Sequence, residues 1–188
     1  IDYPDVFVDQ TRDYAQNISK SISCLRRQVA ERLQQAAIQL PSGIRFKIVE
    51  CHRSLEAQRH IFAEVMDDVK KDHPNWNEQE IYNETSTFVA PPDNTPPHST
   101  GGAIDLTLMT ADGVELDMGT DLNDGYSGTC YTFSESISEE AKKNRQILIR
   151  VMQDAGFVNY PAEWWHWSYG DRYWAYMTGA LIAIYGST

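Results

Sequence analysis

The sequence has few cysteines, little positive charge and no long apolar run, and each shortage excludes a class of protein. Cys24, Cys51 and Cys130 form no Cys-x-x-Cys pair, so neither a zinc knuckle nor a disulfide framework is indicated. We expect idle or buried thiols, with one disulfide as the alternative. A net charge of −11 argues against nucleic-acid binding, which needs a basic face. The longest apolar run, residues 180–184, is too short to span a bilayer.

The size and composition of the chain are those of one globular domain. It has 188 residues, of which 41% are apolar, and no internal repeat or linker divides it. We therefore expect a single domain over residues 1–188. Nothing within the chain resembles a signal peptide, which by itself leaves the compartment open. A cytoplasmic protein is our expectation. A periplasmic or secreted protein is the alternative if a signal peptide precedes Ile1.

The pattern of apolar residues predicts an α+β fold. Apolar residues three and four positions apart predict helices over 18–40, 54–73, 77–85, 138–155 and 172–185. Alternating or aromatic segments predict strands over 44–49, 103–108, 157–158 and 164–169, with a hairpin return over 114–118. Four prolines in residues 90–97 predict an extended, stiff approach to His98, and residues 121–129 are expected to form a loop.

Two short clusters contain the residue types that bind metals. Residues 98–105 read HSTGGAID and residues 163–166 read EWWH, and together they offer two imidazoles and two carboxylates. Three side chains of these types can hold zinc, with a fourth position open to water. An unbroken strand would place His98 and Asp105 on opposite faces, but Gly101 and Gly102 allow a bend that re-aims one of them.

The spacing of Glu163 and His166 also constrains the geometry. Three residues apart, they would share one face of a helix but would point in opposite directions from a strand. The neighbouring tryptophans favour a strand, so we expect Glu163 to lie where that strand begins, after Pro161. From the residues alone, a hydrogen-bonded structural histidine is as good an interpretation of these clusters as a metal ligand.

Taken together, the two clusters resemble the zinc D-alanyl-D-alanine dipeptidase family. The similarity includes the continuation of the first cluster, residues 104–108 (IDLTL), and Arg53, which follows the first well-defined predicted strand and precedes a helix. It covers roughly residues 25–170. The resemblance implies a single zinc peptidase domain with a small, mainly antiparallel sheet that carries the zinc site and is flanked by helices, as in the Hedgehog and D-Ala-D-Ala peptidase-like fold.

The same resemblance implies a role for five side chains. His98, Asp105 and His166 would bind one zinc ion per chain. Glu163 would be the general base that takes a proton from the metal-activated water, and Arg53 would stabilise the transition state. The implied substrate is D-alanyl-D-alanine or a similar small dipeptide, in keeping with a role in peptidoglycan metabolism.

Two departures from the family pattern concern substrate recognition. Pro96 stands where the family has a serine two residues before the first histidine, and Asn123 stands where an aspartate meets the amine of the substrate. Asp121 and Asp124 are candidate substitutes for that aspartate. A D,D- or L,D-carboxypeptidase or endopeptidase acting on peptidoglycan stem peptides is therefore one alternative function. A non-catalytic, zinc-stabilised binding domain of the Hedgehog-like fold is another.

Overall fold

Among the described residues, five strands form one mainly antiparallel sheet. The structure, a computed structural model, describes residues 6–8, 23–122 and 128–188. Across the sheet the strands run in the order β1 (Val6–Val8), β2 (Ile44–Glu50), β3 (Ala103–Thr110), β5 (His166–Ser168) and β4 (Val158–Asn159). β1 pairs with β2 in parallel, and the other neighbouring pairs are antiparallel. The α+β fold predicted from the sequence is confirmed.

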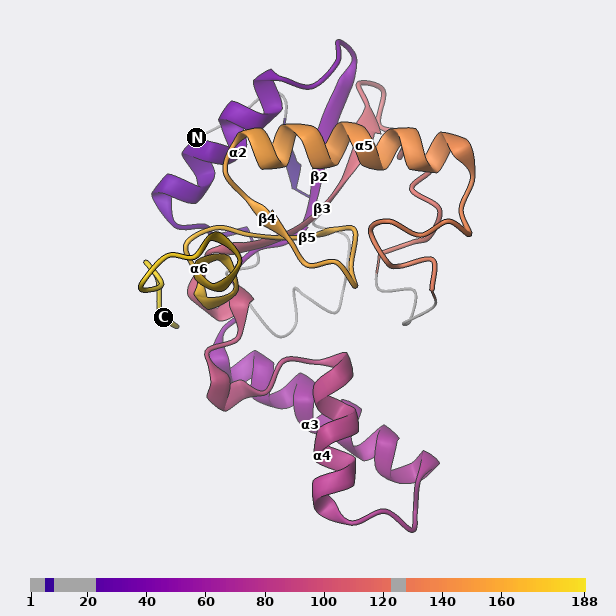
Figure 1. The fold of residues 1–188 in the computed structure, drawn as a ribbon, viewed down its shortest axis with the longest axis vertical. Coiled ribbons are helices and arrows are strands. Elements are labelled where there is room, and N and C mark those ends of the chain that lie inside the picture. The colour runs from indigo at the N-terminus through magenta and orange to yellow at the C-terminus, as the bar shows by residue number, and fades with distance from the viewer. Residues whose placement is uncertain (1–5, 9–22, 123–127) are drawn as a thin grey trace.

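The helices of the described residues form two groups (Figure 1). Helices α2 (Arg27–Ile38) and α5 (Glu139–Asp154) pack on the sheet, whereas α3 (Leu55–Asp72) and α4 (Glu78–Phe88) form a hairpin that projects away from it. The short helix α6 (Arg172–Thr178) follows β5. The core between α2, α5 and the sheet is built from buried apolar side chains, among them Val29, Leu33, Leu106, Leu148 and Val151.

Local capping interactions fix the starts of three helices, each within one residue of the start predicted from the sequence. Ser54 and Ser138 accept hydrogen bonds from the first turns of α3 and α5, and Asn77 forms a capping box with Glu80 at the start of α4. α5 ends just before Gly156, which has a φ of +85°.

The predicted helix over 18–40 is wrong at its start, because α2 begins only at Arg27. Residues 18–22 lie outside the described residues. Contacts distant in sequence hold the chain just before α2 in a non-helical conformation. The Arg26 N–H donates to the carbonyl oxygen of Gly101, and the Cys24 carbonyl oxygen accepts from the N–H of His52. These two hydrogen bonds join the residues just before α2 to the segments around Gly101 and His52.

Three other predictions need correction. The proline-rich segment is not simply extended, because it contains two short 3-10 helices, η1 (Pro92–Asn94) and η2 (Pro97–Thr100), each with proline in its first turn. The predicted strand over 164–169 is shorter, since residues 164–165 lie in a turn. The last helix ends at Thr178 rather than 185, because Gly179 adopts a left-handed conformation there.

The predicted hairpin return over 114–118 forms a single bridge, between Met109 and Glu115, and not a strand. Of the predicted loop over 121–129, residues 123–127 lie outside the described residues. No helix in the described ranges is long and apolar enough to cross a membrane. Cys24, Cys51 and Cys130, all of them described, form no disulfide, and Cys51 and Cys130 are buried whereas Cys24 is exposed.

Candidate metal centre and active site

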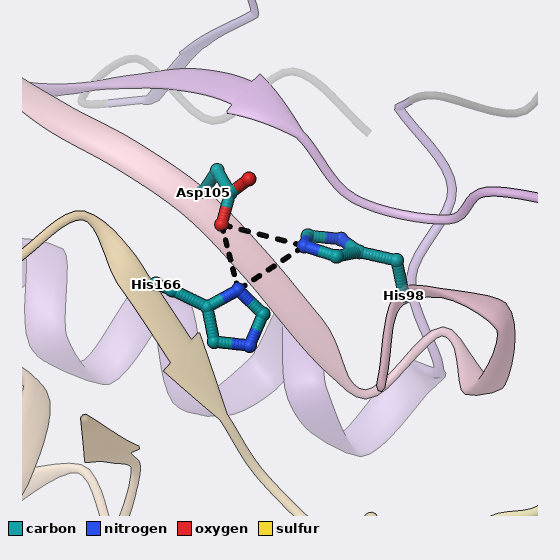
Figure 2. Close-up of side chains that lie close together, drawn as sticks. All are labelled: His98, Asp105 and His166. Atoms are coloured by element: carbon teal, nitrogen blue, oxygen red, sulfur yellow. Dashed lines mark hydrogen bonds and ion pairs between the residues drawn. The ribbon is translucent and has the colours of Figure 1, made fainter. Parts of the chain in front are cut away.

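The fold brings His98, Asp105 and His166 together in one buried cluster (Figure 2). Nε2 of His98 lies 3.2 Å from Nδ1 of His166 and 3.4 Å from Oδ1 of Asp105. That carboxylate oxygen lies 2.9 Å from Nδ1 of His166. One donor atom from each of the three side chains therefore faces a common point, and the trio can hold one metal ion.

Strand pairing places two members of this trio. Asp105 lies directly opposite His166 in the antiparallel ladder between β3 and β5, so their side chains emerge on the same face of the sheet. The third member, His98, comes from η2, just before β3 begins. Gly101 turns the chain between them with a φ of +69°, which removes the alternation that an unbroken strand would impose.

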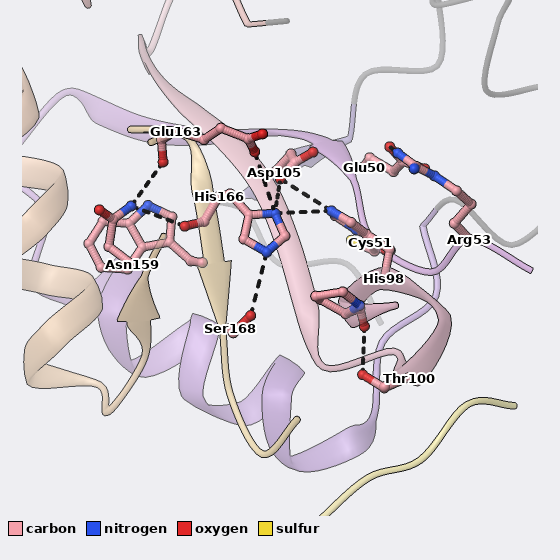
Figure 3. Close-up of polar contacts among 12 residues, drawn as sticks. Glu50, Cys51, Arg53, His98, Thr100, Asp105, Asn159, Glu163, His166 and Ser168 are labelled. Atoms are coloured by element: carbon pink, nitrogen blue, oxygen red, sulfur yellow. Dashed lines mark hydrogen bonds and ion pairs between the residues drawn. The ribbon is translucent and has the colours of Figure 1, made fainter. Parts of the chain in front are cut away.

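Hydrogen bonds to the backbone hold His98 in orientation (Figure 3). Its Nδ1–H donates to the carbonyl oxygen of Cys51 at 2.7 Å, which leaves Nε2 facing the other two side chains. Its own carbonyl oxygen accepts from the backbone N–H groups of Arg53 and Gly101. The turn that carries His98 is thus joined to the chain segment that follows β2.

The electrostatics of the trio are those of a buried, charged cluster. Burial by itself would lower the pKa of His98, but the neighbouring Asp105 carboxylate more than offsets this and raises that pKa to about 9. Burial by itself would raise the pKa of Asp105, but His98 and His166 hold it well below its usual range. A carboxylate that stays ionised beside two imidazoles suits a divalent cation.

Glu163 lies beside the trio without being one of its members. It occupies a turn ahead of β5, where its N–H donates to the carbonyl oxygen of Tyr160 and its own carbonyl oxygen accepts from the N–H of His166. Its Oε2 lies 4.0 Å from Nδ1 of His166. The Asn159 amide donates to the carbonyl oxygens of Glu163 and His166 and so braces this turn (Figure 3). Burial is the main cause that raises the pKa of Glu163.

Arg53 lies in the turn between β2 and α3, where the sequence places it, and its guanidinium is held by two side chains. Its Nε donates to Oε1 of Glu50 at 2.7 Å, and its Nη2 donates to the other oxygen of the same carboxylate. Its Nη1 donates to Oε1 of Gln58 at 3.0 Å. The pairing with Glu50 is bidentate, which fixes the plane of the guanidinium.

These side chains line one cleft with a volume of about 730 Å³. The trio, Glu163 and Arg53 contribute its polar part. The rest of the wall is largely apolar and comes from α3, α4 and the proline-rich segment, through residues such as Ile61, Val65, Phe88, Pro91 and Pro97. The five side chains singled out in the sequence therefore meet in one cavity.

The two departures from the family pattern have different positions. Pro96 is buried and lines the cleft, so it contributes an apolar surface where the family has a serine. Asp121 lines a separate hollow with Asp117 and Trp164, away from the trio. Asn123 and Asp124 lie outside the described residues.

Sequence reasoning missed four residues of the site. Glu50 and Gln58 hold Arg53, Asn159 braces the turn of Glu163, and Tyr160 lines the cleft with its ring packed edge-on to His166. Only Glu50 could have been found from the sequence, since an acidic residue three positions before an arginine can form an ion pair with it. The other three belong to no sequence motif, and their roles can be recognised only from the contacts that they make in the structure.

The site has the composition of a metal-dependent hydrolase. Two imidazoles and a carboxylate converge on one point, the half-buried carboxyl group of Glu163 lies next to them, and an arginine reaches the same cleft. Such a set can bind a cation, move a proton and stabilise a developing negative charge.

Comparison with known proteins gives the family. The family model Peptidase_M15, described as D-ala-D-ala dipeptidase, matches residues 7–180. A D-alanyl-D-alanine dipeptidase of Synechocystis is 30% identical over 177 residues, which are 81% of this chain and 71% of that protein. The chain belongs to the D-Ala-D-Ala dipeptidase family, and thus to a family of peptidases.

Two further relatives match over shorter stretches. A D-alanyl-D-alanine dipeptidase of Escherichia coli is 39% identical over 69 residues, which are 37% of this chain and 35% of that protein. One of Enterococcus faecalis is 33% identical over 104 residues, which are 55% of this chain and 48% of that protein. With these two proteins the matched region is less than half of the relative's length.

Proposed function

We propose that this chain hydrolyses D-alanyl-D-alanine or a similar small dipeptide at one zinc ion bound by His98, Asp105 and His166. The observation that carries the proposal is the buried trio with Glu163 beside it, 4.0 Å from a donor atom of His166. The names of the relatives support the dipeptide as substrate class.

The spacing of the donor atoms is compatible with one zinc ion. Ligands at ~2.1 Å around a tetrahedral zinc ion lie roughly 3.4 Å from one another. The three donor atoms are 2.9 to 3.4 Å apart, close to that value. The set of two histidines and one carboxylate leaves a fourth position for substrate or water, as in catalytic zinc sites.

Zinc bound there would supply a Lewis acid that polarises the peptide carbonyl and lowers the pKa of a water molecule. Glu163 takes the proton of the attacking water and then passes it to the leaving amine. Burial, which raises the pKa of Glu163, favours the protonated form that the second transfer needs. Arg53 stabilises the negative charge that develops on the carbonyl oxygen.

The cleft itself supports a second candidate. A dipeptide of two alanines has about eleven non-hydrogen atoms and fills on the order of 200 Å³ at the packing density of proteins. The described residues enclose a cleft of about 730 Å³ with apolar walls from α3 and α4. A carboxypeptidase or endopeptidase acting on longer peptidoglycan stem peptides is therefore the alternative activity.

Replacement of the base tests the mechanism. We expect Glu163→Gln to lower kcat for D-alanyl-D-alanine by ~100- to 10,000-fold, because a general base contributes about that much. The bound zinc should remain stoichiometric, because Glu163 is not one of the three donors. Release of free D-alanine gives the rate, and elemental analysis of the same preparation gives the metal content.

Glu64→Gln is the matched control, because Glu64 also lies near a histidine, His60, but on the exposed surface of α3. It should retain the wild-type rate. Full activity of Glu163→Gln, or full activity after complete chelation, would contradict the mechanism. A panel of D,D- and L,D-dipeptides and longer stems separates the two activities. Stoichiometric zinc with no hydrolysis of any of them would favour a non-catalytic binding domain.

A further inference from the structure

The inference concerns Gln58, a residue of α3 with an exposed fraction of only 1%. Its Oε1 accepts from Nη1 of Arg53 at 3.0 Å, and its Nε2 donates to the carbonyl oxygen of Ala90 at 2.7 Å. Gln58 thus joins the guanidinium of Arg53 to the segment that follows α4. All three residues line the cleft of the candidate active site.

The two partners of Gln58 require an amide at this position. A guanidinium can only donate hydrogen bonds, and a backbone carbonyl oxygen can only accept them. The side chain between Arg53 and Ala90 must therefore accept on one side and donate on the other. A glutamate would place an acceptor against the Ala90 carbonyl oxygen, and an apolar side chain would leave that oxygen without this donor.

Gln58 and Glu50 hold Arg53 in complementary ways. Glu50 binds Nε and Nη2, and Gln58 binds Nη1, so partners on two sides of the guanidinium fix its orientation. The backbone N–H of Arg53 also donates to the carbonyl oxygen of His98. Arg53 is thereby fixed both at its backbone, to the turn of a candidate metal ligand, and at its side chain.

We propose that Gln58 is a positioning residue, which holds the Arg53 guanidinium in the orientation that stabilises the transition state. The inference rests on the proposed function, because it needs Arg53 to act on the substrate. Gln58 itself does not touch the reacting atoms. Its effect on the rate must therefore pass through Arg53.

A double-mutant cycle tests this dependence. We expect Gln58→Met, which keeps the length of the side chain, to lower kcat/KM by about 10- to 100-fold, as expected for a lost hydrogen bond to a charged group. In an Arg53→Ala background, the same replacement should change kcat/KM by less than about twofold. Zinc content and Tm are measured on every variant. Gln58→Asn, whose amide is too short to reach both partners, gives a second test if Gln58→Met fails to fold.

Thr85→Val is the matched control for lost stability. Thr85 is fully buried in α4, and its hydroxyl donates to the carbonyl oxygen of Ile81, away from Arg53. This variant removes one buried hydrogen bond from the same helical hairpin, so Tm should fall while kcat/KM stays within about twofold of wild type. A Gln58→Met variant with wild-type kcat/KM, or with an equal loss in both backgrounds, would overturn the inference.

A measurement without turnover separates this inference from the proposed function. Phenylglyoxal modifies guanidinium groups, and peptide mass spectrometry gives the rate at Arg53. We expect this rate to rise about tenfold in zinc-loaded Gln58→Met, because the clamp on Nη1 is lost. An unchanged rate would overturn the clamp even if the enzyme is active. A faster rate in a protein that cleaves no dipeptide would uphold the clamp and reject the proposed function.

Discussion

The two histidines of the site present different ring nitrogens to the candidate metal position. His98 donates from Nδ1 to the Cys51 carbonyl oxygen and presents Nε2. His166 presents Nδ1, and its Nε2 lies 3.5 Å from the hydroxyl of Ser168. For His98 the carbonyl oxygen can only accept, so this hydrogen bond selects the tautomer whose Nε2 can bind a cation. The donor atom that His98 offers is thus decided by a backbone group outside the trio.

Metal binding at this site should depend on pH through His98. In the metal-free protein the Asp105 carboxylate raises the pKa of His98 to about 9, so the imidazole carries a proton at neutral pH. A cation can bind only after that proton has left, so affinity should rise by about tenfold per pH unit between about pH 6 and pH 8. Competition with a chromophoric chelator measures the affinity. Calorimetry in two buffers should count about one released proton per ion.

His60→Gln serves as the control for this pH dependence, because His60 is an exposed histidine on α3, paired only with Glu64. Its zinc affinity should follow the wild-type pH profile. An affinity that does not change over this pH range would show that no proton is displaced from His98.

At the scale of elements, the junction between η2 and β3 decides whether His98 and Asp105 meet. Gly101 needs its positive φ, and Gly102 needs the absence of a side chain. A Cβ at Gly102 would lie 2.6 Å from the carbonyl oxygen of Tyr169. The two segments of the chain approach closely there because Tyr169 donates its N–H to the carbonyl oxygen of Gly102.

Gly102→Ala should therefore destabilise the fold and the site together. The clash is with backbone, so β3 and β5 must move apart, at a cost of ~1–3 kcal/mol, typical of overpacking. Because Asp105 and His166 pair across the same two strands, zinc affinity should fall as well. Urea unfolding and metal competition measure the two effects. Gly128→Ala, at a position with open space around it, should match wild type in both, and wild-type behaviour of Gly102→Ala would refute the steric account.

At the scale of the whole molecule, the candidate ligands join segments far apart along the chain. His98 and His166 are 68 residues apart, and Asp105 and His166 are 61 apart. An unfolded chain does not hold these three groups together, so a cation that binds the trio binds the folded state selectively. The energy of binding then adds to the energy of folding.

Zinc should accordingly raise the melting temperature. At a free concentration about 100 times Kd, binding contributes ~2.7 kcal/mol. For a chain of this size each kcal/mol corresponds to roughly 2–4 °C, so Tm should rise by about 5–10 °C. Thermal unfolding with chelator and with buffered zinc measures the shift. In His166→Ala the shift should be largely lost, and equal Tm values for the wild-type protein in both conditions would show that zinc does not bind the folded trio.

The local sequence was sufficient to predict the parts of the structure that depend on neighbouring residues. The predicted starts of α3, α4 and α5, at two serines and an asparagine, lie within one residue of the observed starts, because N-capping involves groups only two or three positions apart. The two candidate clusters could be identified from residue types and spacing, whereas Arg53 was identified from the resemblance to the family. Their meeting in one cleft could not, since the 68 residues between His98 and His166 permit many arrangements.

The tertiary structure decided what depends on distant groups. The late start of α2 results from hydrogen bonds to Gly101 and His52, which compete with the helical pattern before Arg27. The pairing of Asp105 with His166 follows from the register of β3 and β5. The clamp of Gln58 on Arg53 carries no sequence signal at all, because an amide acquires its donor and acceptor roles from the partners that the fold places beside it. The sequence by itself thus determined which groups are available for chemistry, and the register and packing of the folded chain determined which of them act together.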